Sequence, residues 1–279
     1  MIGKTRQIAA GPRGVLVPGF ETGQFRHQRG APCAALARLV EHYWYVGWDM
    51  EGLPPRVQET LPHPNVHLVV EHDSDGIYGV HTARYTKQLA GRGFAFGVKF
   101  RPGGFRPFLG RPLSAIADSR LALEELFGAD GGSFAHAIRL LASDGKEAAM
   151  MDAAEAFLLA RLPAPDPDAE LAAALVDAIA ADPAMRTVDA LAQYAGLNKR
   201  TMQRLFQQYV GVGPKWVIKR YRMHEAVARL QAGKPAGLAQ LALDLGYFDQ
   251  AHFINDFTAL VGQPPAAYAR SVAEVVEAG

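Results

Sequence analysis

The sequence predicts an α+β fold, with a β-rich N-terminal domain and its trailing helices ahead of an all-α C-terminal domain. Three observations support this. Short aromatic or β-branched runs bounded by turn residues fill the first 112 residues and indicate a cupin-like barrel or a sandwich. A proline-rich stretch at residues 163–167 interrupts regular structure. The residues that follow have the three- and four-residue apolar spacing of helices.

Length and composition are those of a globular chain of about two domains. It has 279 residues, of which 49% are hydrophobic and 20% charged. The single cysteine, Cys33, excludes an internal disulfide framework and a cysteine-based metal cluster, as is usual in a reducing compartment. No apolar run approaches the ~18–20 residues that span a bilayer. We therefore expect a cytoplasmic protein with no membrane partner.

The first domain is expected to cover residues 1–162. Its clearest strands are predicted at residues 41–46, 66–70 and 94–100, and helices are predicted from about residue 113. The last of these, at 144–161, is Ala-rich and amphipathic. Two roles stay open for it: an interface between two copies of the chain, or packing within its own domain.

The predicted linker at residues 163–167 contains Pro163, Pro165 and Pro167. Each proline lacks a backbone N–H and disfavours a helical residue before it, so neither a helix nor a central strand should cross this stretch. The second domain is then expected at residues 168–270, followed by a C-terminal tail at 271–279.

The formal net charge of +1 conceals an asymmetry between the two parts. Residues 1–183 contain 18 Lys and Arg against 21 Asp and Glu, whereas residues 184–270 contain 11 against 5. A basic segment of this kind is typical of a module that binds a polyanion, although a solvated helical face has the same composition. The charge alone does not decide between these interpretations.

A helix–turn–helix pattern is present at residues 187–206. Thr187 and Asn198 are placed to cap the two helices, and Gly196 lies where the chain must reverse with a positive φ. Met202 and Phe206 recur at helical spacing and are expected to face inward. The opposite face would carry Lys199, Arg200, Gln203 and Arg204.

The same pattern occurs again at residues 238–257, with Gly246 in the turn and Asp249 as the cap. The caps Asn198 and Asp249 lie 51 residues apart, so one small unit is repeated. Between the units, a helix is predicted from Pro214 to about Leu230, a length of about 25 Å. Such a spacer could place two recognition helices about 34 Å apart, in adjacent major grooves of double-stranded DNA.

The segment from about Asp168 to Arg270 resembles the DNA-binding domain of AraC/XylS-type bacterial transcription regulators. The resemblance rests on residues 246–257, GYFDQAHFINDF, and on residues 261–268, VGQPPAAY. It implies a sequence-specific DNA-binding transcription regulator. On the matching positions it implies DNA contacts by Arg200, Gln203, Arg204, Gln250, Ala251, His252 and Asn255, and Lys199 on the same outer face completes the predicted set.

One position departs from the family pattern. Asn255 stands where the family commonly has Arg, and Asp256 follows it. Asparagine can pair with adenine but neutralises no phosphate, whereas arginine favours guanine and adds charge. We therefore expect the first unit and the linking helix to carry the basic surface, and the first unit to supply most of the affinity.

In this family a β-rich first domain implies a sensor of a small-molecule effector that also mediates dimerisation, with RNA polymerase as a further partner. Residues 61–65 and 99–105 are similar to a poorly characterised N-terminal domain of some AraC-type proteins. The predicted effector contacts are Tyr43, Trp44, Trp48, Phe94, Phe96 and Arg101. The alternatives are that these aromatic residues form the core and that Arg101 lies in a surface turn.

The alternative function is a cupin-type metal-binding enzyme or metal sensor fused to a DNA-binding adaptor. Its candidate ligands are close in sequence: His63, His67, His72, His81, Glu59, Glu71, Asp73 and Asp75. Their spacing matches no metal signature, and nucleophile-elbow, phosphate-loop and dinucleotide motifs are absent from the sequence. We therefore expect no enzyme activity, no metal and no cofactor.

Overall fold

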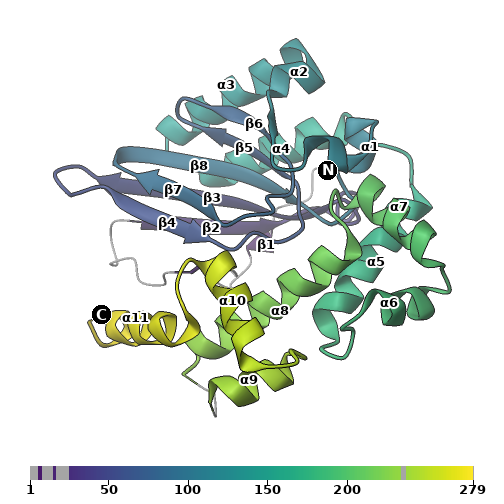
Figure 1. The fold of residues 1–279 in the computed structure, drawn as a ribbon. Coiled ribbons are helices and arrows are strands. Elements are labelled where there is room, and N and C mark those ends of the chain that lie inside the picture. Colours follow the sequence, from purple (N-terminus) through teal and green to yellow (C-terminus); the bar gives the residue numbers. More distant parts are fainter. Residues whose placement is uncertain (1–5, 8–14, 17–24, 234–236, 279) are drawn as a thin grey trace.

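The computed structural model describes residues 6–7, 15–16, 25–233 and 237–278. It confirms the predicted fold class, because an antiparallel sheet with its helices is followed by an all-α domain (Figure 1). The two domains pack directly against each other, and the long helix α8 (Pro214–Gln231) lies between them (Figure 1).

The larger sheet has the strand order β1-β2-β3-β8-β5-β6-β9, and β4 and β7 form a separate pair. The pairings between its strands are antiparallel. The strands are β1 (Arg6–Gln7), β2 (Phe25–Ala31), β3 (Val40–Met50), β4 (Arg56–Thr60), β5 (His67–Glu71), β6 (Asp75–Tyr78), β7 (Tyr85–Leu89), β8 (Gly91–Phe100) and β9 (Arg120–Leu121).

Alternation along β3 separates the two faces of the sheet. Tyr43 and Tyr45 point into the core, whereas Trp44 lies on the other face. Trp44 is paired with Gly97 of β8, and a Cβ on that glycine would lie 2.2 Å from the indole ring. Glycine is therefore needed here so that the sheet can carry the large ring.

Helices α3 (Ala129–Ser143) and α4 (Glu147–Leu159) pack on the core face of the sheet. Met150, Ala154 and Leu158 of α4 are buried in that core. The apolar face of α4 is therefore used for packing within its own domain, which is one of the two roles that the sequence left open.

The structure adds elements that the sequence pattern did not reveal. The short helix α1 (Arg106–Leu109) begins before residue 113, where the sequence predicted the first helices. Between the helical segments η1 (Leu113–Ile116) and α2 (Leu123–Phe127), the short strand β9 pairs with β6. A two-residue strand has too little sequence to show a period of two. Its pairing depends on a partner more than 40 residues away in the chain.

The C-terminal domain contains α5 to α11. Asp166 caps α5 by accepting hydrogen bonds from the N–H groups of Asp168 and Ala169, so the helix begins at Pro167, inside the predicted linker. At the other end, α11 continues through residue 271, where the sequence predicts a tail. The helices are α5 (Pro167–Ala181), α6 (Val188–Ala195), α7 (Lys199–Tyr209), α8, α9 (Leu238–Asp244), α10 (Gln250–Val261) and α11 (Pro265–Ala278).

Residues from the N-terminal part enter both C-terminal cores. Leu16 and Leu61 are buried with Phe253 and Phe257 of the second helix–turn–helix unit. Val80 is buried with the core of the first unit. The N-terminal domain therefore contacts both units as well as the helix that joins them.

Candidate nucleic-acid interface

The first helix–turn–helix unit is built by the predicted caps. The Thr187 hydroxyl accepts a hydrogen bond from the Ala190 N–H at 3.1 Å, and the Asn198 side chain accepts one from the Thr201 N–H at 2.9 Å. Gly196 ends α6 with φ +63°, and the Leu197 N–H then donates to the Ala192 carbonyl. The structure confirms this unit.

The second unit repeats the arrangement. Asp249 accepts a hydrogen bond from the His252 N–H at 2.7 Å, and Gly246 has φ +76°. The Tyr247 N–H donates to the Ala242 carbonyl, as Leu197 does to Ala192 in the first unit. The helix α8, which joins the two units, also agrees with the prediction in its start and length.

All eight predicted DNA contacts have exposed side chains. They lie on α7 and α10, the second helix of each unit, and on each helix the opposite face is buried through Met202, Phe206, Phe253 and Phe257. The exposed residues are Lys199, Arg200, Gln203, Arg204, Gln250, Ala251, His252 and Asn255. The N-terminal domain leaves this surface open, and the contacts with DNA stay a prediction.

The two recognition helices differ in charge. On α7, Arg200 and Arg204 have no ion-pair partner within the described part of the chain, and Lys199 pairs with the equally exposed Asp189. On α10 the outward side chains of Gln250, Ala251 and Asn255 are neutral. The first unit therefore offers the cations that phosphate contacts need.

Asp256 on α10 has a structural role that the sequence did not indicate. Its carboxylate pairs with Lys219 of α8 at 2.7 Å, accepts a hydrogen bond from the Tyr247 hydroxyl at 3.2 Å, and lies 3.6 Å from His252. Burial, followed by the nearby Asp256 charge, raises the pKa of Tyr247. Asp256 thus holds α10 to the linking helix.

The expectation of a basic surface on the linking helix holds only in part. Arg220 is only 1% exposed, because loops of the N-terminal domain cover it. Lys219 is paired with Asp256, and Arg222 donates to the carbonyl of Arg186. Of the cations on α8, Lys215 is exposed, and the Lys219 side chain is 44% exposed although it is paired. The sequence showed these charges but not which of them the first domain covers.

Arg220 joins the two domains. Its guanidinium donates to the carbonyls of Thr82 at 2.5 Å and Pro62 at 3.3 Å, and it lies 4.4 Å from the centre of the Trp216 ring. Burial lowers its pKa to about 10, so it remains charged at neutral pH. Asp118 fixes the Thr82 loop by accepting from both the N–H and the hydroxyl of Thr82.

Two histidines stack across the same interface. The rings of His63 and His224 lie 3.8 Å apart and are parallel within 4°. Burial lowers the pKa of His224 to about 3, helped by the Arg220 charge. Burial also lowers the pKa of His63 well below its usual value, and so does the positive charge that His224 carries when it is protonated. Both rings are therefore neutral when they stack.

Two further contacts tie the domains together. Arg84 donates to the Val261 carbonyl at 2.6 Å and pairs with Glu59. Arg101 pairs with Asp177 of α5 at 2.5 Å, and the turn that follows it packs against Ala169 through Gly103. The surface-turn alternative for Arg101 is thus wrong, because this turn lies between the domains.

The six predicted effector contacts do not form one site. Tyr43 and Phe96 are 0% exposed in the core. Trp44 lies on the other face of the sheet, with its indole edge-on to His67. Arg101 lies at the domain interface. These positions correct the prediction of one pocket, which failed because strand alternation sends neighbouring aromatic residues to opposite faces.

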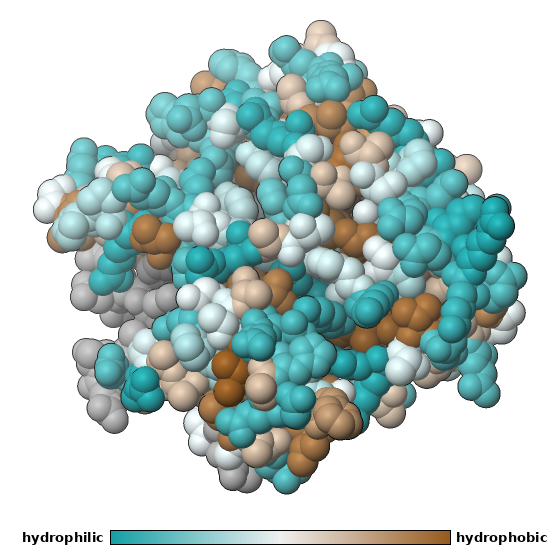
Figure 2. Space-filling view, in the orientation of Figure 1, coloured by the Kyte–Doolittle hydropathy of each residue, from teal (hydrophilic) through white to brown (hydrophobic). Residues whose placement is uncertain are grey.

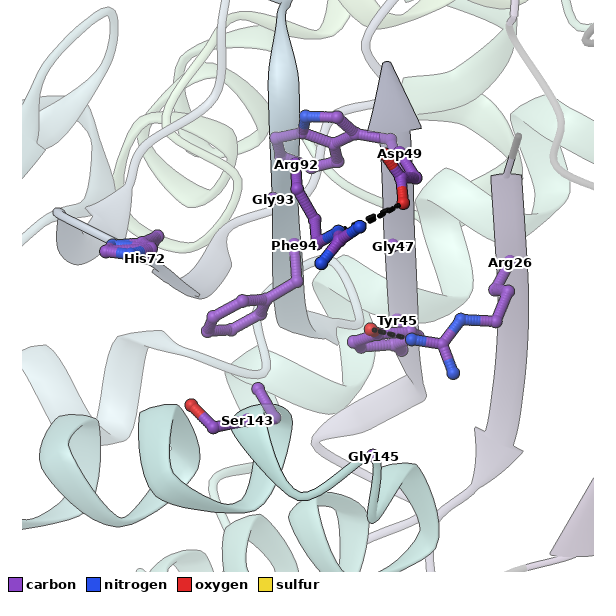
Figure 3. Close-up of a pocket in the computed structure, with 12 residues that line it drawn as sticks. Arg26, Tyr45, Gly47, Asp49, His72, Arg92, Gly93, Phe94, Ser143 and Gly145 are labelled. Atoms are coloured by element: carbon purple, nitrogen blue, oxygen red, sulfur yellow. Dashed lines mark hydrogen bonds and ion pairs between the residues drawn. The ribbon is translucent and has the colours of Figure 1, made fainter. Parts of the chain in front are cut away.

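The two remaining residues, Trp48 and Phe94, line an open cleft of about 620 Å³ (Figure 3). The cleft lies between strands β2, β3 and β8 and the turn from α3 to α4. Phe94 stacks on Tyr45 in its floor, with ring centres 6.4 Å apart. At its rim, Arg26 contacts Tyr45 and Glu147, and Arg92 pairs with Asp49 at 2.8 Å. Tyr45 belongs to the aromatic residues that the sequence already offered for a pocket, whereas Arg26 and Arg92 were not indicated by the sequence.

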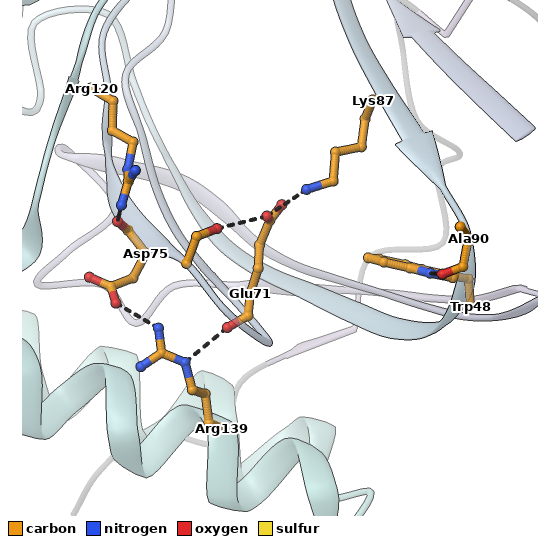
Figure 4. A network of polar contacts seen from close by, with 8 residues as sticks. Trp48, Glu71, Asp75, Lys87, Ala90, Arg120 and Arg139 are labelled. Atoms are coloured by element: carbon orange, nitrogen blue, oxygen red, sulfur yellow. Dashed lines mark hydrogen bonds and ion pairs between the residues drawn. The ribbon is translucent and has the colours of Figure 1, made fainter. Parts of the chain in front are cut away.

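Several side chains of the metal alternative have other partners. Glu71 accepts from Lys87 and Ser74, and Asp75 accepts from Arg139 (Figure 4). His63 stacks on His224, and His72 borders the cleft. Within the described residues, no three His, Cys, Asp or Glu side chains are placed to hold a metal ion.

Two capped helix–turn–helix units joined by one long helix define a tandem helix–turn–helix domain. Residues 191–271 match the family model described as "Helix-turn-helix domain", and residues 28–122 match "Domain of unknown function (DUF6597)". The C-terminal domain is a helix–turn–helix domain of the AraC type, and it follows a DUF6597 domain.

Two bacterial transcription regulators are similar to this chain. An uncharacterised HTH-type regulator of Haemophilus influenzae is 31% identical over 85 residues, which are 30% of this chain and 28% of that protein. The HTH-type regulator GlxA of Rhizobium meliloti is 32% identical over 81 residues, 29% of this chain and 25% of that protein. The similarity thus spans only about a quarter of each relative's length.

Solved structures overlap with parts or most of the chain at low TM-scores. A transcriptional regulator from Chromobacterium violaceum, described among AraC-type DNA-binding domain-containing proteins, has a TM-score of 0.33 and 24% identity, covering 36% of this chain and 89% of that one. ToxT from Vibrio cholerae O395 has a TM-score of 0.39 and 10% identity, covering 89% of this chain and 97% of that one.

None of the helices in the described part of the chain combines the length and the apolar character of a membrane span.

Proposed function

We propose that this chain regulates transcription in the bacterial cytoplasm by placing α7 and α10 in adjacent major grooves of double-stranded DNA. The observation that carries the proposal is the exposed face on the second helix of each of two capped units, joined by an 18-residue helix. That helix is about 27 Å long, and with the width of each unit added it can set the two recognition helices about 34 Å apart, the length of one DNA turn.

The test is selection of bound sequences from a random DNA pool by the full-length chain. The expected result is enrichment of a site with two half-sites about 10 base pairs apart, because the two units are expected to follow one face of the duplex. Failure to enrich any sequence over competitor DNA would refute specific regulation.

We further propose that the cleft binds a small effector. Its volume is in the range of ligand sites, and its floor is aromatic. Arg26 and Arg92 at the rim are 64% and 68% exposed, so each can take a ligand carboxylate beside its present acidic partners, Glu147 for Arg26 and both Asp49 and Glu51 for Arg92. An apolar carboxylic acid fits this chemistry. The route to DNA would be the domain interface at Arg220 and His224.

A panel of small aromatic and aliphatic carboxylic acids tests the effector site by the shift in Tm. A compound that raises the Tm of the wild type should lose its effect on Ser143→Phe, because Ser143 lines the cleft and a phenyl ring would fill it. Ser133→Phe is the control, since Ser133 is exposed on the same helix but does not line the cleft. An equal response of both variants would place the ligand elsewhere.

A further inference from the structure

Phe248 is an exposed aromatic residue at the start of the second recognition helix. It is 93% exposed, the largest value among the exposed large hydrophobic residues of the described chain. It directly precedes Asp249, the cap of α10. Burying such a side chain stabilises a folded chain, so full exposure forgoes a stabilising contact.

The ring is exposed because the second turn is one residue longer than the first. Gly196 precedes its cap Asn198 by two positions, whereas Gly246 precedes Asp249 by three. Tyr247 takes the place of Leu197, since both donate a backbone hydrogen bond to the alanine five residues earlier. Tyr247 is buried, so the additional residue, Phe248, has no place in the core.

The surroundings of Phe248 fit a base edge better than a phosphate. Residues at the N-terminal end of a recognition helix contact base edges in the major groove, and apolar side chains contact the methyl group of thymine. Ala251 and Asn255 on the same helix are exposed and neutral, and Asp256 is paired with Lys219. The second unit therefore offers apolar and polar contacts in place of free cations.

Figure 2 agrees with a mixed surface in this region. Hydrophobic, brown residues stand among teal ones at the lower edge of the molecule, where α9 and α10 lie in Figure 1. Leu243 of α9 is also exposed, at 56%. In the part of the chain that the structure describes, Phe248 makes no ring contact with another aromatic residue.

We propose that Phe248 determines specificity in the second half-site by contacting the C5-methyl group of a thymine. The inference rests on the proposed function, since it requires α10 to enter the major groove. Beyond entry of α10 into the groove, it assigns one contact, between the Phe248 ring and the methyl group of one thymine.

The test uses the full-length chain and a site selected from the random pool. Each thymine of the site is replaced in turn by deoxyuridine, which lacks only the methyl group. Wild type should lose about fourfold in affinity at one position, the value of one buried methyl-sized group. Phe248→Ala should bind the thymine site about fourfold or more weakly and should no longer distinguish thymine from deoxyuridine there.

Leu243→Ala is the matched control, because it removes an exposed apolar side chain from the same unit outside the recognition helix. It should keep the wild-type discrimination between thymine and deoxyuridine. Both variants should keep the wild-type Tm, since neither side chain is buried.

Three results would overturn the proposal. Phe248→Ala could keep the discrimination, or it could weaken binding while wild type discriminates at no position, which would indicate a contact with the DNA backbone. It could also leave DNA binding unchanged while transcription in a purified system falls, which would indicate a protein partner. If wild type selects no DNA sequence at all, the proposed function itself fails, which is a separate outcome.

Discussion

At the scale of single residues, Arg204 and Asn255 represent the two recognition helices. Arg204 is an exposed cation with no ion-pair partner among the described residues, and Asn255 is exposed and neutral. We predict that Arg204→Ala costs about 1–3 kcal/mol of specific DNA binding, and that Asn255→Ala costs less.

Fluorescence anisotropy on the selected site, repeated at several salt concentrations, measures both losses. If Arg204 contacts a phosphate, its removal should also reduce the salt dependence of binding by about one counterion. A larger loss from Asn255→Ala than from Arg204→Ala would contradict the order.

At the scale of helices, the Lys219–Asp256 pair fixes α10 against α8. The Asp256 side chain is only 18% exposed and also accepts from Tyr247. We predict that Asp256→Asn lowers the free energy of unfolding by about 1 kcal/mol, measured by urea denaturation. Asp189→Asn is the control, because its pair with Lys199 is exposed on both sides and should contribute almost nothing. Equal losses would show that the pair does not hold the helix.

At the scale of the whole molecule, Arg220 couples the domains through two carbonyls of the N-terminal domain. We predict that Arg220→Met weakens this coupling by about 2 kcal/mol, because hydrogen bonds from a charged group are lost while an apolar side chain of similar length remains. Calorimetry should then resolve two transitions where wild type gives one. Lys215→Met, at an exposed position of the same helix, should behave as wild type.

Acid should weaken the same interface. His224 has a pKa of about 3 in the folded chain, against the ordinary 6.5, so below pH 6.5 the unfolded chain binds more protons. The free energy of unfolding should be insensitive to this residue above pH 6.5 and should fall as the pH drops toward 3. The slope is at most about 1.4 kcal/mol per pH unit for each such histidine.

Urea denaturation of His224→Gln between pH 7 and pH 4 checks this prediction. The variant should show a shallower fall in stability than wild type, although His67, whose pKa is also about 3, continues to contribute. His136→Gln, at an exposed position of α3, is the control and should keep the wild-type slope. A wild-type slope in His224→Gln would show that this histidine does not set the acid sensitivity.

The predictable parts of the molecule are those whose signals lie within one short segment. The caps Thr187, Asn198 and Asp249 and the turn glycines of both units can be recognised from neighbouring residues alone. The strands at 40–50, 67–71 and 91–100 were also predictable, with ends shifted by a few residues. Short β9 and the proposed cleft were not, because each depends on segments far apart in the chain.

The sequence by itself determined two capped helix–turn–helix units, their long connecting helix and the β-rich domain before them. Tertiary structure decided which charged and aromatic side chains remain available. Arg220 has the residue type and the position on a helix that are expected of a cation facing DNA. It nevertheless lies buried against Thr82, which is 138 residues earlier in the chain. Phe248 is a residue type that usually lies in a core, yet its side chain is exposed to solvent. Burial depends on which distant surfaces meet, and a local pattern holds no information about that.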